Sequence, residues 1–214
     1  MLRKLIIAAA VVLATAIQVP AQDNGGNYFG VRISFDVMHP AGHSSGLNNG
    51  SGFTLKGIYN FSFARSWFLE PGVGVFYNTV GIKPVDVDDK LYDGSIRNFG
   101  LRIPVAAGYR FSIGDILDLA ACTGPQFNVN LISKARLQPN FEGPAPTRST
   151  DLFDYGWRRF DAQWMFGISA TYAGSYYLGI SGAVGFTPMA RFDTPGGPER
   201  IRRNTVSITL GYNF

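Results

Sequence analysis

Residues 204–214 alternate between apolar side chains and small or polar ones. Val206, Ile208, Leu210, Tyr212 and Phe214 are apolar, whereas the residues between them are threonine, serine, glycine and asparagine. A period of two is the side-chain alternation of a β-strand, because successive side chains point to opposite faces. An apolar face with aromatic residues near one end, opposite a small or polar face, is typical of a strand that faces lipid in a membrane barrel.

Seven further segments upstream show the same alternation. In the first, Phe29, Val31 and Ile33 alternate with Gly30 and Arg32. None has a helical period, and each is about as long as a tilted membrane strand needs to be. Together with 204–214 they predict eight strands, and the seven cover residues 28–38, 52–63, 67–79, 98–111, 116–131, 159–172 and 175–187.

The connections between these segments alternate in length. Residues 39–51, 80–97, 132–158 and 188–203 form long connections, and residues 64–66, 112–115 and 173–174 form short ones. Long extracellular loops and short periplasmic turns are the rule in outer-membrane barrels. A soluble barrel would place its apolar face inside, but here the charged residues lie on the less apolar face. We therefore predict an all-β fold, an eight-stranded antiparallel up-and-down transmembrane β-barrel.

The N-terminal residues predict a cleaved signal peptide. Arg3 and Lys4 precede an apolar run from Leu5 to Ile17, and a small-residue cleavage site ends at Ala21. The run of about 13 residues is short of the roughly 20 that span a bilayer. We expect a signal peptide over residues 1–21, a barrel domain over residues 22–214, and export to the outer membrane of a Gram-negative bacterium.

Composition agrees with an exported β-protein. Glycine accounts for 26 of 214 residues, aromatic residues for 14% and charged residues for only 16%. Removing Arg3 and Lys4 lowers the formal net charge from +4 to +2, which is too mild to suggest a nucleic-acid partner. Cys122 is the only cysteine, so no intramolecular disulfide can form.

The predicted inner face carries equal numbers of basic and acidic residues. Buried charges need partners, and eight strands enclose a space only wide enough for side chains. We expect a salt-bridged polar network that fills the barrel, with a path for small solutes as the alternative. The residues are Arg32, Lys56, Arg102 and Arg110, with Asp36, Glu70, Asp118 and Asp161.

Three prolines interrupt the predicted strands. Pro71, Pro104 and Pro125 cannot donate a ladder hydrogen bond, so we expect bulges or local breaks at each. The surrounding blocks, 69–75, 101–111 and 124–127, resemble those of the PorT-like outer-membrane β-barrel proteins of the Bacteroidetes. The resemblance spans residues 28–214 and implies the barrel fold. A named member of that family is associated with a secretion and gliding apparatus, so the resemblance also implies a secretion apparatus or another envelope protein as a partner.

No motif predicts catalysis, a metal or a cofactor. His39 and His43 lie near Ser44 and Ser45 at the first extracellular rim, where eight-stranded lipid A acyltransferases use His, Ser and Asp. A lipid A-modifying enzyme is therefore the alternative to a solvated loop. The acidic residues at positions 86, 88 and 89 lack the glycine and distal glutamate of a calcium loop, which favours a solvated surface.

Basic residues near an aromatic residue in the long third and fourth connections suggest a binding surface. Loops of this length on a small barrel are usually interaction surfaces or mobile, and arginine suits the phosphates of lipopolysaccharide. We predict a monomeric, non-enzymatic protein that binds or scaffolds through these loops. The candidate residues are Trp157, Arg158, Arg159, Arg191, Arg200, Arg202 and Arg203.

The aromatic C-terminal residues resemble an assembly signal. Tyr212 and Phe214 lie on the apolar face of the last strand, where outer-membrane barrels carry the signal read by the barrel assembly machinery. We expect that machinery, the outer-membrane lipid and lipopolysaccharide to be partners of this chain.

Overall fold

A computed structural model describes residues 26–42, 46–63, 66–87, 90–114, 116–139, 148–194 and 197–214. Within these ranges the chain forms ten β-strands and one short 3-10 helix. The strands are β1 (Tyr28–Ala41), β2 (Leu47–Ser62), β3 (Trp67–Val87), β4 (Lys90–Ile113), β5 (Leu117–Pro139), β6 (Arg148–Asp151), β7 (Phe160–Tyr172), β8 (Tyr176–Gly185), β9 (Pro188–Thr194) and β10 (Gly197–Asn213). The helix η1 (Phe153–Tyr155) lies between β6 and β7.

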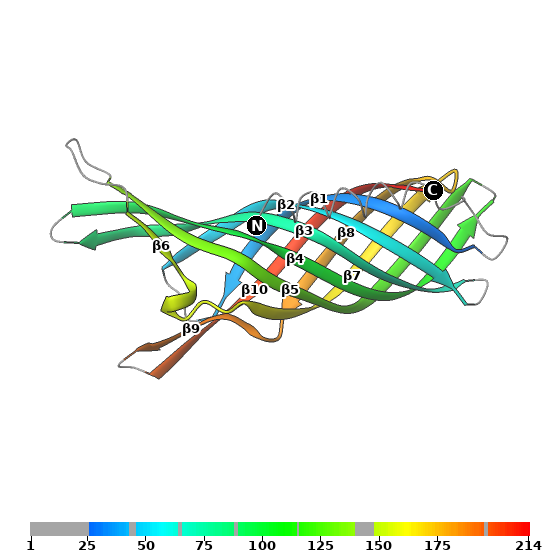
Figure 1. The fold of residues 1–214 in the computed structure, drawn as a ribbon. Helices are drawn as coiled ribbons and strands as arrows, with labels where there is room; N and C mark the ends of the chain where they lie inside the picture. Colours follow the sequence, from blue (N-terminus) through cyan, green and yellow to red (C-terminus); the bar gives the residue numbers. More distant parts are fainter. Residues whose placement is uncertain are drawn as a thin grey trace.

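Eight of these strands form a closed antiparallel barrel (Figure 1). The order around the barrel is β1, β2, β3, β4, β5, β7, β8 and β10, and β1 pairs with β10 to close it. The closing register runs from Gly30 opposite Asn213 to Ala41 opposite Arg202. The two remaining strands are additions: β6 pairs with β5, and β9 pairs with β10. The predicted all-β, eight-stranded up-and-down barrel is therefore confirmed.

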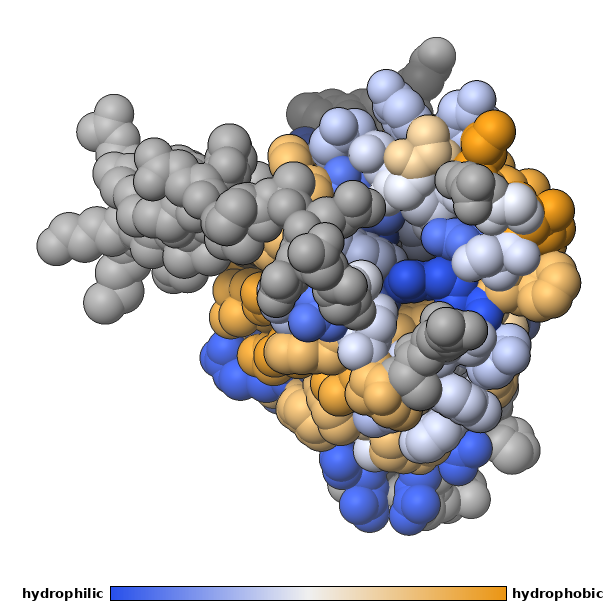
Figure 2. All heavy atoms as spheres, turned by 90° about the vertical axis from the view of Figure 1, so that its right-hand side faces the viewer, coloured by the Kyte–Doolittle hydropathy of each residue, from blue (hydrophilic) through white to orange (hydrophobic). Residues whose placement is uncertain are grey.

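The two faces of the barrel wall differ in polarity as the alternation predicts. On β10, Ile208 is 53% exposed on the outer face, whereas the neighbouring Thr209 is 4% exposed and points inward. A view along the barrel shows hydrophobic residues over much of the outer wall and hydrophilic ones in the hollow at the centre (Figure 2). A protein surrounded by water rarely exposes a continuous apolar surface of this extent, whereas a transmembrane barrel exposes one to lipid. The outer wall therefore suits lipid.

The long connections are shorter than the sequence suggested, because the strands continue into them. β3 extends to Val87, β4 begins at Lys90, and β5 extends to Pro139. β9 and the first residues of β10 form a further hairpin in the predicted fourth loop. The short connections lie at the opposite end of the barrel (Figure 1). Following the rule for outer-membrane barrels, we refer to the end with the long hairpins as the extracellular end.

The prolines interrupt the ladder without changing its register. Between β3 and β4, Pro71 lies opposite Val105 and Gly74 lies opposite Arg102. The two pairs between these positions are missing, but the register is kept. Pro125 stays paired with Trp164. On its other side, toward β4, the pairs at Pro125 and Gly124 are missing while the register is kept. The expected local breaks thus occur near all three prolines, but the expected bulges do not. The register shifts instead at other places, among them the step between Phe99 and Gly100.

The expected signal peptide, residues 1–21, lies outside the described residues. No helix within the described ranges is long and apolar enough to cross a membrane.

Candidate functional site

One carboxylate joins four strands in the middle of the lumen. Asp36 on β1 accepts hydrogen bonds from Arg102 Nη1 at 2.7 Å and Ser207 Oγ at 2.6 Å, and a third from the Thr54 hydroxyl. Arg102 Nε also donates to Asn128 Oδ1 at 3.1 Å. Asp36 and Arg102 are both almost fully buried. Because every oxygen of this carboxylate has a partner, the pair meets the condition under which a buried ion pair is tolerated.

A second buried ion pair lies beside the first. Arg203 Nη2 on β10 is 3.2 Å from Asp161 Oδ2 on β7 and donates to Asn130 Oδ1 at 2.9 Å. The Phe76 ring connects the two pairs, since the guanidinium carbons of Arg102 and Arg203 lie 5.2 Å and 5.1 Å from its centroid. Such distances are those of cation–π contacts. The middle of the lumen is therefore filled by a charged and aromatic layer.

The periplasmic half of the lumen holds Arg32 and Arg110. Arg32 Nη2 donates to Asn213 Oδ1 at 2.6 Å, and its guanidinium carbon is 3.9 Å from the centroid of the Tyr177 ring. Arg110 Nη2 donates to the Tyr28 hydroxyl at 3.2 Å. A cavity of about 60 Å³ near Tyr28 and Arg110 leaves room for only a few water molecules.

The eight residues expected inside thus fall into separate groups rather than one network. Asp36, Arg102 and Asp161 join the central layer, whereas Asp118 accepts a hydrogen bond from Ser112 at the periplasmic end. Lys56 and Glu70 also lie on the lumen side, half-buried by their exposed area. Among the described residues, Arg203 is a further inner cation that the set of eight does not include.

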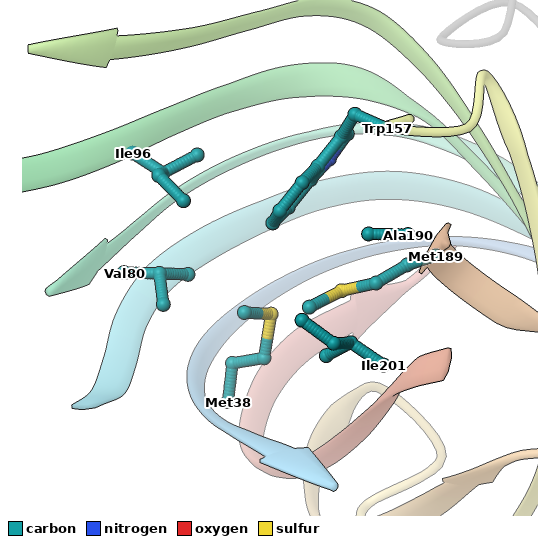
Figure 3. Close-up of a cluster of buried hydrophobic side chains, with 7 residues drawn as sticks. All are labelled: Met38, Val80, Ile96, Trp157, Met189, Ala190 and Ile201. Atoms are coloured by element: carbon teal, nitrogen blue, oxygen red, sulfur yellow. The ribbon is translucent and has the colours of Figure 1, made fainter. Parts of the chain in front are cut away.

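An apolar cluster closes the lumen above the charged layer (Figure 3). Its side chains come from β1, β3, β4, β9, β10 and the segment after η1. The members are Met38, Val80, Ile96, Trp157, Met189, Ala190 and Ile201, and all are at most 4% exposed. We call this group the outer apolar cluster.

Backbone hydrogen bonds attach the segment after η1 to β9. Trp157 pairs with Ala190 in an isolated bridge, and Arg158 N donates to the Met189 carbonyl at 2.8 Å. Arg191 N donates to the Gly156 carbonyl at 2.9 Å. These bonds hold Trp157 over the lumen instead of at the membrane interface.

Two of the seven residues predicted for surface binding are buried and must be removed from that surface. Trp157 is 4% exposed in the outer apolar cluster, and Arg203 is 0% exposed in the charged layer. The strand alternation could have placed Arg203: β10 begins at Gly197, so the inward positions Thr205 and Ser207 continue upstream to Arg203 and Ile201. Trp157 carried no comparable signal, because it lies outside the alternating segments.

The other five residues of that set are exposed, and Arg191 on β9 lies directly opposite Arg200 on β10. They are Arg158, Arg159, Arg191, Arg200 and Arg202. Arg159 lies over the Phe153 ring, with 4.1 Å from guanidinium carbon to ring centroid. Arg200 and Arg202 lie on β10, beside β9.

The candidate catalytic and metal residues are only partly described. His39 lies on the exposed side of β1, and its Nδ1 is 2.6 Å from Asn49 Oδ1. Positions 43–45, 88 and 89 lie outside the described residues, and the backbone of Asp86 belongs to β3. Among the described residues, no three histidine, cysteine or acidic side chains are grouped as metal ligands would be.

Tyr212 and Phe214 lie together at the periplasmic end of the closing seam. Their ring centroids are 5.1 Å apart, and the Phe214 ring lies 6.2 Å from that of Phe29 on β1. Phe214 N donates to the Phe29 carbonyl at 2.8 Å. This arrangement connects the last strand to the first.

A closed barrel with an apolar outer wall and a filled polar lumen defines an outer-membrane β-barrel protein. The model for the outer membrane protein β-barrel domain matches residues 7–214, and the chain belongs to this family. Membership places the protein in the outer membrane of a Gram-negative bacterium. No match was found among curated proteins.

Solved structures of other outer-membrane proteins are similar to this chain. Ail, the attachment invasion locus protein of Yersinia pestis, is 16% identical with a TM-score of 0.45, over 88% of this chain and 99% of that one. OprG from Pseudomonas aeruginosa is 13% identical with a TM-score of 0.47, over 91% and 99%. Neisserial surface protein A is 11% identical with a TM-score of 0.42, over 87% and 97%.

Proposed function

We propose that this protein is a non-enzymatic outer-membrane barrel that binds an extracellular protein partner by pairing it with the free edge of β6. The observation that carries this proposal is the position of β6. Within the described part of the chain, β6 pairs with β5 only, so its other edge offers unpaired backbone groups. An exposed edge of this kind is a template for an added strand, which is a common mode of peptide recognition.

The sheet that carries β6 projects beyond the apolar part of the barrel. The upper parts of β3, β4 and β5 stay paired far past the lipid-facing rows, from Gly81 opposite Ser95 to Val87 opposite Lys90. β6 continues this sheet at the extracellular end (Figure 1). Ser149 and Thr150 of β6 are exposed. A partner strand could therefore approach from the extracellular space without entering the membrane.

The outer apolar cluster supports this role because Leu152 and Phe153, which follow β6, pack against it. Trp157 anchors the chain two residues after η1, and Leu152 N donates to the Ser133 carbonyl at 3.0 Å. A binding edge that is ordered before the partner arrives loses less conformational entropy on binding.

The filled lumen favours binding over transport or catalysis. The charged layer around Phe76 and the outer apolar cluster both occupy the space a solute would need. His39 lies on the outer side of β1 with Asn49 as its partner, and no described acid is bonded to it to form a catalytic pair. These observations favour the binding function over the lipid A-modifying enzyme and the small-solute channel.

A photo-crosslinking amino acid at Ser149 tests the proposal. In whole cells it should give a crosslinked product, and the same amino acid at Ile208 on the lipid face should not give that product. The amides of two successive strand residues point to opposite edges, so one of Ser149 and Thr150 donates toward the free edge and the other toward β5. Ser149→Pro and Thr150→Pro should therefore differ in their effect on crosslinking, because one removes a donor at the free edge and the other removes a bond to β5. If neither proline alters crosslinking from a nearby position, or if Ser149 yields no product, β6 is not the docking edge.

We further infer that the chain is a PorT-like member of its family from the Bacteroidetes, expected to act as a monomer beside a secretion apparatus or another envelope protein. The blocks 69–75, 101–111 and 124–127 support this finer assignment. Co-purification of the protein with secretion components, lost in a Thr150→Pro or Ser149→Pro variant, would link the assignment to the β6 edge.

A further inference from the structure

The apolar outer wall ends abruptly on β3, β4 and β5. Tyr77, Phe99 and Ile132 are paired across these strands and face outward. The next outward row toward the extracellular end contains Thr79, Arg97 and Lys134. The wall thus changes from apolar to polar between two successive outward rows, and two of the three polar side chains are basic. On a membrane barrel, this step marks the height at which acyl chains give way to headgroups.

Two positive charges lie directly opposite each other in the first row above this step. Arg97 on β4 pairs with Lys134 on β5, and Arg136 lies one outward position further along β5. Both Arg97 and Lys134 are exposed. Directly opposite residues of an antiparallel pair have Cβ atoms about 5 Å apart, and like charges at this spacing destabilise a sheet. A sheet with no ligand would be more stable with an opposite charge at one of these positions.

No described residue neutralises this pair. Within the described ranges, neither the Arg97 nor the Lys134 side chain makes a hydrogen bond or an ion pair. The nearest acid in the pairing is Asp151, opposite Lys134 on β6. Its Oδ1 instead accepts a hydrogen bond from Phe153 N at 3.1 Å, at the start of η1. The two cations therefore remain available to an anion from outside the chain.

We propose that Arg97 and Lys134, supported by Arg136, form a phosphate site for the phosphorylated glycolipid of the outer leaflet, lipid A. Charge-assisted hydrogen bonds from a guanidinium and an ammonium suit a phosphate group. The row beneath, with Phe99 and Ile132, offers an apolar surface to the acyl chains of the same molecule. The proposal concerns lipid, so it does not depend on a protein partner at β6.

The sign of a stability change tests this site. In phosphatidylcholine vesicles without lipid A, the variant Arg97→Gln removes like-charge repulsion and should raise the thermal midpoint of the refolded protein. In vesicles that also contain bisphosphorylated lipid A, the same variant removes a phosphate ligand and should lower the midpoint relative to wild type. A purely structural role for Arg97 would shift the midpoint in the same direction in both vesicles, and that result would overturn the proposal.

Lipid retention measured by native mass spectrometry provides the second readout. The double variant Arg97→Gln/Lys134→Gln should retain bisphosphorylated lipid A at least about tenfold less than wild type, the fold-change of one charge-assisted hydrogen bond. The matched control Arg158→Gln/Arg202→Gln removes the same charge from two exposed arginines that have no cation directly opposite them, and it should retain lipid A as wild type does. An equal loss in the control would show diffuse attraction and no site. Stabilisation by inorganic phosphate alone, to the same degree as by lipid A, would contradict a lipid site.

Discussion

Neutralising Asp36 should destabilise the barrel far more than removing an ordinary lumen hydrogen bond. The variant Asp36→Asn keeps the side-chain shape but removes the negative charge that Arg102 Nη1 contacts at 2.7 Å. Both side chains are only 4% exposed, so water cannot replace the lost interaction. Breaking a buried ion pair by removing one partner costs about 3–5 kcal/mol. We expect the free energy of unfolding to fall by an amount in this range.

The control for this prediction is Ser34→Ala on the same strand. Ser34 Oγ lies 2.8 Å from Thr209 Oγ1 in the lumen, and neither group is charged. Loss of one such hydrogen bond should cost about 1 kcal/mol. Asp36 and Ser34 both face inward on β1, so the two variants differ mainly in charge.

The assay is urea unfolding of the refolded barrel in lipid vesicles, followed by heat-modifiable migration on a gel and by tryptophan fluorescence. A double-mutant cycle with Arg102→Gln isolates the pairwise term, and the double variant should be less destabilised than the sum of the single ones by about 0.5–3 kcal/mol. If Asp36→Asn costs no more than Ser34→Ala, the lumen is hydrated enough to screen its charges, and the filled charged layer described above is wrong.

Three further changes test other parts of the structure. Trp157→Ala should lower the free energy of unfolding by about 3–5 kcal/mol because it leaves a cavity in the outer apolar cluster. The variant should still give no steady conductance in planar bilayers, because the charged layer blocks the lumen, and large steady openings would contradict this. Ile208→Arg should cost about 2–4 kcal/mol on the lipid face and reduce the folded fraction on a gel, whereas Ile208→Leu should leave it unchanged; equal fractions would reverse the assignment of faces. Gly100→Ala should impair folding, since its added Cβ would meet a neighbouring backbone carbonyl, whereas Gly182→Ala should be tolerated because its Cβ would meet only a side-chain atom at 4.0 Å; similar folding yields for the two would refute this.

The sequence alone predicted the membrane-spanning part of the fold for a direct physical reason. Lipid on one side and polar side chains on the other impose a strict alternation, and a shift of one residue would place Ser207 in lipid and Ile208 in the lumen. That constraint weakens above the membrane. There β3, β4 and β5 remain paired, but no lipid requires an apolar side chain at every second position, so these residues were predicted as loops.

The inner residues Asp36, Arg102 and Asp161 were predicted from the alternation, but the parts of the site that lie outside the alternating segments were harder to predict. Trp157 becomes buried only because β9 folds back and pairs with it, an arrangement that no local pattern specifies. The Arg97–Lys134 pair depends on the step in register after Phe99, where Leu131 has no opposite residue and both Leu131 and Ile132 face outward. Without that bulge, Lys134 would point into the lumen.

The hydrogen bonds around Asp36 have a consequence for how the barrel is assembled. Two of its partners, Thr54 and Arg102, come from strands that are synthesised soon after β1. The third, Ser207, lies 171 positions away on the strand that closes the barrel. Closure is thus an event of high contact order, and such events are slow and open to mispairing.

The same carboxylate can reject an incorrect closure. If β10 paired with β1 one residue out of register, Val206 or Ile208 would replace Ser207 beside Asp36, and a buried oxygen would lose its donor. Such an unsatisfied charged group costs about 1–3 kcal/mol or more, in addition to the loss of the lipid-facing surface. The lumen residues therefore favour the correct register, because the closed barrel is most stable when β10 pairs with β1 in the alignment that gives Asp36 its donor.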